Sequence, residues 1–184
     1  MPGSPVAVAD PEFYESVQDG NVFSAMTALT GVAPGTAVST TAAFALYNPI
    51  GSEVDLVIIE GRMGYVSGTL GAGVITWNVN TDDEGAAFTG TGITEVNMKL
   101  GSGVAAVGRA LTTATIPAPT PVRVFGNLQA SLASTAVAPW TIRDRVDGAI
   151  VVPPGCGVSL HGTAAAGTSP LVVFSVTWKE QNRA

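Results

Sequence analysis

The sequence has few charged residues, and this scarcity excludes several classes of protein. Only 12% of its 184 residues are charged, whereas an ordinary soluble domain has about 25%, and lysine occurs only twice. Because 46% of the residues are hydrophobic, the chain lacks the low hydropathy and high charge of disordered proteins. A long coiled coil or helical bundle is also excluded, since these are rich in Glu, Lys, Leu and Arg.

Cysteine and histidine each occur once, which limits the available chemistry. Cys156 cannot form an internal disulfide, so the fold does not depend on oxidation. His161 alone cannot supply the several imidazole ligands of a cupin-like metal site. The two residues lie five positions apart, but Cys–His catalysis requires hydrogen-bond contact and an orienting third group. We therefore expect a buried or half-buried thiol at Cys156 and an ordinary surface histidine at His161.

Basic residues are too scattered for a nucleic-acid-binding surface. The net charge is −6, from 14 acidic and 8 basic residues. Arg143 and Arg145 are the one close pair of bases, and Asp144 and Asp147 interleave with them. Binding to nucleic acid or to an anionic membrane depends on clustered cations. We therefore expect neither nucleic acid nor a membrane among the partners.

Long uninterrupted hydrophobic runs are also missing. Residues 149–178 carry no formal charge apart from His161, but prolines and glycines interrupt this stretch repeatedly. A membrane-spanning helix requires about 20 unbroken apolar residues, so we do not interpret the stretch as a span. The N-terminal residues have no cationic region followed by an apolar core, and we expect no secretory signal there.

Glycine and proline, by contrast, are abundant, with 22 and 12 residues. Turn signals separate short β-patterned segments about every 8–12 residues, which is typical of an all-β sandwich or barrel. Two segments alternate clearly: Ile75, Trp77 and Val79 share one face of residues 74–80, and residues 172, 174, 176 and 178 share one face of the last strand. The other expected strands are residues 54–60, 107–116, 122–132, one or two strands within 141–152, and 158–164. We predict a jelly-roll-like antiparallel β-sandwich, because it leaves few strand edges exposed.

The domain organisation follows from where the β pattern begins. Over residues 1–35 we expect an N-terminal arm, extended and proline-rich at its start, followed by an irregular or short helical segment. Residues 36–184 are expected to form the β-sandwich domain. Within it, residues 81–92 are predicted to form a loop, and the strands at 158–164 and 171–180 a hairpin.

No catalytic or cofactor motif is apparent. Asp82, Asp83 and Glu84 could bind a hard cation, but the EF-hand spacing is missing, so a solvated loop is the preferred interpretation. The remaining carboxylates give no reason to pair any two for hydrolysis, and neither a phosphate-binding loop nor a G-x-S-x-G elbow is present. We therefore expect a protein that is not an enzyme, with no cofactor and no metal.

Five residues are candidates for an interface. Aromatic and arginine side chains are enriched at the anchoring centres of protein interfaces. On this basis the candidates are Phe13, Tyr14, Trp140, Arg143 and Arg145. For the last three an alternative stays open, in which Trp140 is a core residue beside a strand that carries two solvated arginines.

Four stretches of the sequence resemble small virion proteins of tailed bacteriophages. They are ALYNPIGSEVDLVI, YVSGTLGAG, LQASLASTAVAPW and DGAIVVPPGCGVSLHGTAAAGTSPLVVFSVTWKE, which together extend over roughly residues 40–180. Proteins of this group are head decoration (cement) proteins or related capsid-surface proteins. The resemblance implies a β-sandwich or jelly-roll body, commonly trimeric, on the outer surface of the capsid.

The function expected from this resemblance is structural. The chain would bind the major capsid protein and further copies of itself, as a homotrimer, on virions assembled in the bacterial cytoplasm. The alternative is a receptor- or glycan-binding β-sandwich on the phage surface or tail, in which Trp77, Trp140 and Trp178 would offer stacking platforms. Because Trp77 and Trp178 lie on the apolar faces of predicted strands, we expect both in the core.

Overall fold

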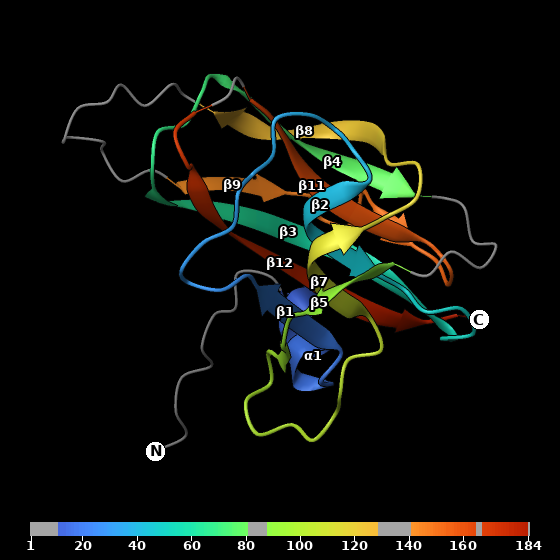
Figure 1. The fold of residues 1–184 in the computed structure, drawn as a ribbon. Coiled ribbons are helices and arrows are strands. Elements are labelled where there is room, and N and C mark those ends of the chain that lie inside the picture. The colour runs from blue at the N-terminus through green and yellow to red at the C-terminus, as the bar shows by residue number, and fades with distance from the viewer. Residues whose placement is uncertain (1–10, 81–87, 129–140, 165–166, 184) are drawn as a thin grey trace, which may run out of the picture.

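The chain folds into two six-stranded antiparallel sheets that pack face to face (Figure 1). The computed structural model describes residues 11–80, 88–128, 141–164 and 167–183. Sheet A consists of β1 (Val22–Met26), β3 (Val54–Ser67), β6 (Glu95–Asn97), β9 (Thr141–Arg145), β10 (Val151–Val152) and β12 (Leu171–Asn182). Sheet B consists of β2 (Thr41–Tyr47), β4 (Gly73–Asn80), β5 (Thr89–Gly92), β7 (Arg109–Thr115), β8 (Thr120–Leu128) and β11 (Gly157–Ala164).

The strand pairing is that of a jelly roll. The first half of the chain pairs with the second half in reverse order: β1 with β12, β2 with β11, β3 with β9 and β10, and β4 with β8. The resulting antiparallel ribbon is rolled up, so that β12 also pairs with β3 and β11 also pairs with β4. The predicted jelly-roll sandwich is thus confirmed.

Strict alternation along the central strands builds the core between the sheets. On β12 the side chains of Val172, Phe174, Val176 and Trp178 are all fully buried, as the period of two predicts. On β4 Trp77 faces them, and Phe125 of β8 packs between Trp77 (ring centroids 5.6 Å apart) and Phe174 (6.3 Å). The two segments with the clearest sequence pattern therefore form the centre of the core.

An insertion between β4 and β8 covers one side of the jelly roll. Its strand β6 pairs with β1 in sheet A, while β7 pairs with β2 and β5 with β7 in sheet B. Residues 116–119 then connect β7 to β8. In sheet B these two strands lie on opposite sides of β2, β11 and β4, and β8 forms the far edge. Directly after β7, Ile116 joins Ala45, Tyr47 and Phe88 in a second apolar cluster on the outer face of sheet B, over β2 and β7.

Three sequence-based expectations are corrected by the fold. The strands at 158–164 and 171–180 do not form a hairpin, because β11 lies in sheet B and β12 in sheet A. The sandwich begins before residue 36, since β1 is already part of sheet A. Residues 89–92, expected in a loop, form β5, because backbone pairing with β7 stabilises this glycine- and threonine-rich segment.

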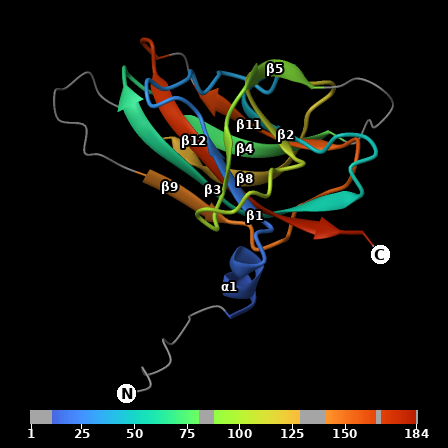
Figure 2. The same cartoon turned by 90° about the horizontal axis from the view of Figure 1, so that it is seen from below.

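The one helix of the described residues is α1 (Pro11–Gln18), which projects from the sandwich below sheet A (Figure 2). Proline is favoured at a first helical position, and Glu12 in the first turn complements the helix dipole. Gly20 ends the helix with φ +78°: its N–H donates to Val17 O, and the Asn21 N–H donates to Ser16 O. This pair of bonds is a Schellman cap, which directs the chain into β1.

Candidate functional site

A groove between α1 and the outer face of sheet A brings together two of the predicted interface residues. Phe13 lines it from the helix, and Arg145 lines it from the end of β9. Ile59 of β3 and Lys179 of β12 line it from the sheet, and the cavity has a volume of about 310 Å³. Residues distant in the sequence therefore line one groove, which α1 shares with three strands of sheet A.

The groove combines an apolar surface with charges of both signs. Phe13 and Ile59 supply the apolar surface, Glu12 and Asp147 supply negative charge, and Arg145 and Lys179 supply positive charge. Aromatic and arginine side chains at the centre with a mixed polar rim are typical of protein–protein interfaces. Chemically, the groove is suited to bind another protein surface.

The other predicted interface residues lie near this groove or outside the described part of the chain. Tyr14 follows Phe13 on α1 and is exposed. Arg143 lies two positions before Arg145 on β9, so both arginines point to the same side of the strand. Trp140 lies outside the described residues, and the choice between a core and an interface position for it stays a prediction.

Arg143 is already engaged in an ion-pair network. Its Nε donates to Glu60 Oε2 at 2.7 Å, and Arg62 Nη2 lies 2.8 Å from Glu60 Oε1. Both arginines are exposed, so this network adds little to the free energy of folding. The network instead orients side chains, because the Glu60 carboxylate holds the guanidinium groups of Arg62 and Arg143 on the outer face of sheet A.

A second charged cluster was not predicted from the sequence. Asp144 accepts two hydrogen bonds from Arg123, at 2.9 Å from Nε and 2.7 Å from Nη2, and one of 2.9 Å from Trp77 Nε1. The hydrogen bond and the charge of Asp144 raise the pKa of Arg123. The cluster joins β9 of sheet A to β8 and β4 of sheet B. The sequence contained one indication of this cluster. Side chains alternate along a strand, so Asp144 points to the opposite face of β9 from Arg143 and Arg145, towards the other sheet.

His161 is buried, which corrects the prediction of a surface histidine. It is 2% exposed on β11, and its Nε2 lies 3.1 Å from the Oγ of Ser159, which is also buried. Burial lowers the pKa of His161 to about 4, so the imidazole is neutral at pH 7. The reason is tertiary: the loop before β2 packs beside this strand, where Gly162 N–H donates to Pro34 O at 2.6 Å.

The Ser159–His161 pair has the residue types of a nucleophile and its base, but its setting is structural. Next to it on β4, Asn78 Nδ2 donates to Thr76 O at 2.9 Å and lies 3.5 Å from Ser159 O. Nucleophilic catalysis of this type needs an acid to orient the imidazole. In the described residues no carboxylate hydrogen-bonds to His161. Ser159, His161 and Asn78 are best explained as polar side chains that satisfy their hydrogen bonds locally on a covered face of the sheet.

The remaining candidates for chemistry or ligand binding are resolved in part. Cys156 is half-buried, as predicted. Trp77 and Trp178 are fully buried in the core, also as predicted, so neither offers a stacking platform for a sugar. The acidic stretch Asp82–Glu84 lies outside the described residues. Elsewhere, in the part of the chain that the structure describes, no three His, Cys, Asp or Glu side chains gather as a metal site.

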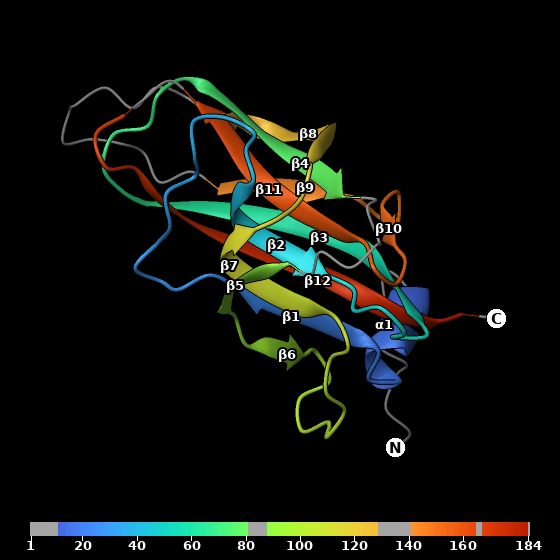
Figure 3. The ribbon, with the colours of Figure 1, turned by 45° about the vertical axis from the view of Figure 1, so that its right-hand side comes forward.

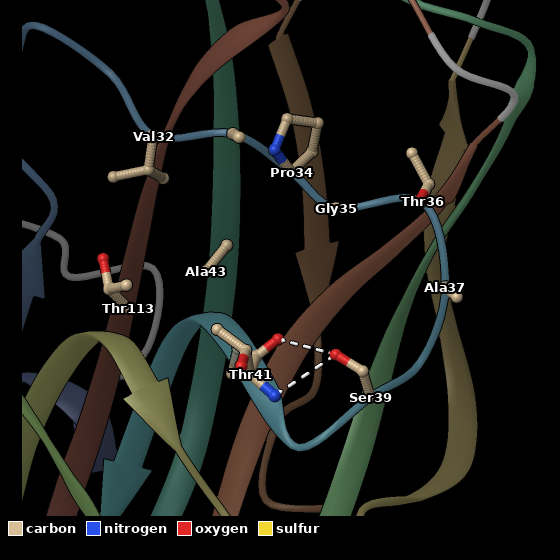
Figure 4. Close-up of a pocket in the computed structure, with 11 residues that line it drawn as sticks. Val32, Pro34, Gly35, Thr36, Ala37, Ser39, Thr41, Ala43 and Thr113 are labelled. Carbon is tan, nitrogen blue, oxygen red and sulfur yellow. Dashed lines mark hydrogen bonds between the residues drawn. The ribbon is translucent and has the colours of Figure 1, made fainter.

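A larger pocket lies between the loop that precedes β2 and the beginning of β2 itself (Figure 4). It has a volume of about 390 Å³ and is lined by small apolar and hydroxyl-bearing residues, among them Pro34, Thr36 and Ala43. The Ser39 hydroxyl donates to Thr41 O and accepts from Thr41 N, both at 3.2 Å. Its lining contains no titratable side chain, so this pocket provides shape and hydroxyl groups but no acid or base.

Neither family models nor curated proteins supply a relative of this chain: no protein-family model matches it, and a search of curated proteins finds no match. Among the described residues, no helix has the length and hydropathy needed to cross a membrane.

Proposed function

We propose that this chain is a structural protein of a tailed-bacteriophage virion: a head decoration (cement) protein that binds the outer capsid surface. It acts through contacts with the major capsid protein and with further copies of itself, as a homo-oligomer of the trimeric kind that the resemblance implies. Its contribution is buried contact area, which holds the capsid subunits together against the pressure of packaged DNA.

The observation that carries the proposal is the groove beside α1. It places Phe13 and Arg145 together at the surface, with Tyr14 exposed on the same helix. These are the residue types that dominate the binding energy of interfaces. The groove is therefore suited to receive an exposed segment of a capsid subunit.

Two further properties of the molecule support a role in contact formation. The rigid β-sandwich presents surfaces that are ordered before binding, which lowers the entropy lost on docking. Only 12% of the residues are charged, so closely spaced copies on one shell repel each other little. Both properties suit a protein present in many copies on a particle.

The test compares particles with and without the chain. Particles of the virus that encodes it, assembled without this protein, should release their DNA at a lower temperature, and adding the purified protein should restore the wild-type temperature. The double substitution F13A/R145A should abolish this restoration. I50A, at an exposed apolar residue in the turn between β2 and β3, is the matched control and should restore it fully.

Two outcomes would refute the proposal. One is equal heat resistance of particles with and without the chain. The other is that the protein fails to sediment with particles from an infected culture. Full restoration by F13A/R145A would leave the function in place but would remove the groove as its binding site.

A further inference from the structure

The segment that begins in β6 and continues beyond it exposes an unusual number of large apolar side chains. In residues 96–107, here called the apolar finger, they are Val96, Met98, Leu100, Val104 and Val107. Leu100, at the tip, is 88% exposed. Single exposed apolar residues are normal, but a contiguous group of this kind marks a binding surface.

The finger is held in place before it binds anything. Ser102 N–H donates to Lys99 O at 3.0 Å, and Gly101 has φ +82°, so a tight turn presents Leu100. Asn97 Nδ2 donates to Gly20 O (2.7 Å) and lies 3.3 Å from Val104 O. At the base, the N–H groups of residues 107 and 108 donate to the buried carboxylate of Glu180. A surface ordered in this way loses little entropy on docking.

A matching concave surface lies on the opposite side of the sandwich. This edge groove, between β8 and β10, has a volume of about 430 Å³. It is lined by Val79, Val122, Arg123, Ala149, Ile150 and Val151. Val122 and Val151 are both about half exposed, so the groove offers apolar surface to a partner.

The topology places the finger and the groove at opposite edges of one sheet. In sheet A the strand order is β10-β3-β12-β1-β6, so β10 borders the groove and β6 leads into the finger (Figure 3). Two different surfaces on opposite sides of a protomer can meet only in a head-to-tail contact. A contact of this type closes into a ring when its rotation allows it.

The distribution of charge selects these two surfaces among the possible contacts between two copies of the chain. The charged residues are few, but 14 of the 22 are acidic, so a contact between two copies is least repulsive where the surfaces lack carboxylates. The finger contains Lys99 as its one charged residue, and the edge groove contains Arg123, whose charge is paired with Asp144. Because Asp144 neutralises Arg123, Lys99 of a second copy would meet a groove without net charge, whereas a finger-to-finger contact would bring two Lys99 ammonium groups together.

We infer that the apolar finger of one copy inserts into the edge groove of the next, and that this heterologous contact builds the homo-oligomer. The inference rests on the self-association included in the proposed function and assigns the surfaces that carry it. The hydrophobic effect drives the contact, because Leu100 and the neighbouring apolar side chains leave water and pack against Val122, Val151 and Ile150.

The test measures the mass of the purified full-length protein by sedimentation velocity over a range of concentrations. The wild-type protein should form one closed species, whose mass is a whole multiple of 18.6 kDa. L100E, in the finger, and V151E, in the groove, should each raise the dissociation constant at least about tenfold. L29E is the matched control, since Leu29 is 75% exposed in a turn outside both surfaces, and it should leave the mass unchanged.

Mixing the two variants gives the decisive result. L100E keeps an intact groove and V151E keeps an intact finger, so an equimolar mixture should form heterodimers at a concentration at which each variant alone is monomeric. A contact of each surface with itself predicts no such rescue. A monomeric wild-type protein at all concentrations, or variants that associate as the wild type does, would overturn the inference. Because particle binding is measured separately, either result leaves the proposed function to its own test.

Discussion

Asp144 and Trp77 connect the two sheets through a hydrogen bond of 2.9 Å between the Asp144 carboxylate and the indole Nε1. Trp77 is fully buried, and Asp144 is the acceptor that its N–H finds at the edge of the core. The same carboxylate holds the guanidinium of Arg123 at the surface. One aspartate therefore satisfies a core residue and a surface residue on two strands of the opposite sheet.

Removal of the Asp144 carboxylate should lower the free energy of unfolding. D144A leaves the buried N–H of Trp77 without its acceptor, which typically costs about 1–3 kcal/mol. D144N keeps an oxygen for the indole and should cost less. R123A removes the ion pair of a partly exposed guanidinium and its hydrogen bond of 3.0 Å to Arg145 O, but it leaves the Trp77 N–H its acceptor, and it should cost about 1 kcal/mol or less. Urea unfolding followed by tryptophan fluorescence gives the three values, and an R123A loss as large as that of D144A would contradict this assignment.

His161 should make the fold less stable as the pH falls from about 6.5 to about 4. Its pKa is about 4 in the folded protein, against 6.5 for an ordinary histidine, so the folded state favours the neutral imidazole. Above pH 6.5 neither state binds the proton, and the effect is absent. Below it the unfolded chain binds a proton that the folded chain does not, so stability falls by up to about 1.4 kcal/mol per pH unit and levels off below pH 4.

The His161 prediction is measured as a difference between two proteins. Carboxylates also titrate near pH 4, so the wild type is compared with H161N over pH 4–7 in urea unfolding. Because the chain has one histidine, the variant removes the whole contribution. The stability gap between the two should change by at most about 3 kcal/mol across this range. A constant gap, or an imidazole pKa near 6.5 by NMR, would show that burial does not perturb this histidine.

The sequence predicted those parts of the fold in which local pattern and tertiary environment agree. Along β12 and β4 each apolar side chain of the period-two pattern faces the core, so Trp77 and Trp178 were placed correctly. His161 was misplaced because β11 has a polar outer face that resembles a solvated one. The segments that pack against this face, such as Pro34 beside Gly162, come from elsewhere in the chain and leave no signal within β11.

The candidate site was predicted in its residue types but not in its contacts. Aromatic and arginine residues suggested Phe13 and Arg145 separately, and only the fold brings residue 13 of the helix beside residue 145 of β9. Arg143 was predicted as an interface anchor from its residue type, whereas in the structure it hydrogen-bonds to Glu60, which is 83 positions away in the sequence. Pairing between distant strands fixes such contacts, and a single sequence does not contain the register.

Glu180 should be essential for the attachment of the insertion. Its buried carboxylate accepts hydrogen bonds from Val107 N and Gly108 N, each at 2.9 Å, and from Trp178 Nε1 at 3.2 Å. E180A leaves these donors unpaired and should reduce the free energy of unfolding by about 2–4 kcal/mol. Hydrogen exchange should show lost protection at the amides of residues 107 and 108. Q181A, at the exposed neighbour, is the control, and equal effects of the two substitutions would refute this role.

Gly61 and Gly64 provide a matched pair for the packing of the core. Both lie on β3, but a Cβ at Gly61 would lie 2.5 Å from Phe125 and 2.6 Å from Trp77, whereas a Cβ at Gly64 would meet nothing within 4 Å. Because buried aromatic rings cannot move aside without disturbing their neighbours, G61A should cost about 1–3 kcal/mol through overpacking. G64A should change stability by no more than about 0.5 kcal/mol. Thermal unfolding of the two variants measures the difference, and equal stabilities would mean that β3 does not approach the aromatic core this closely.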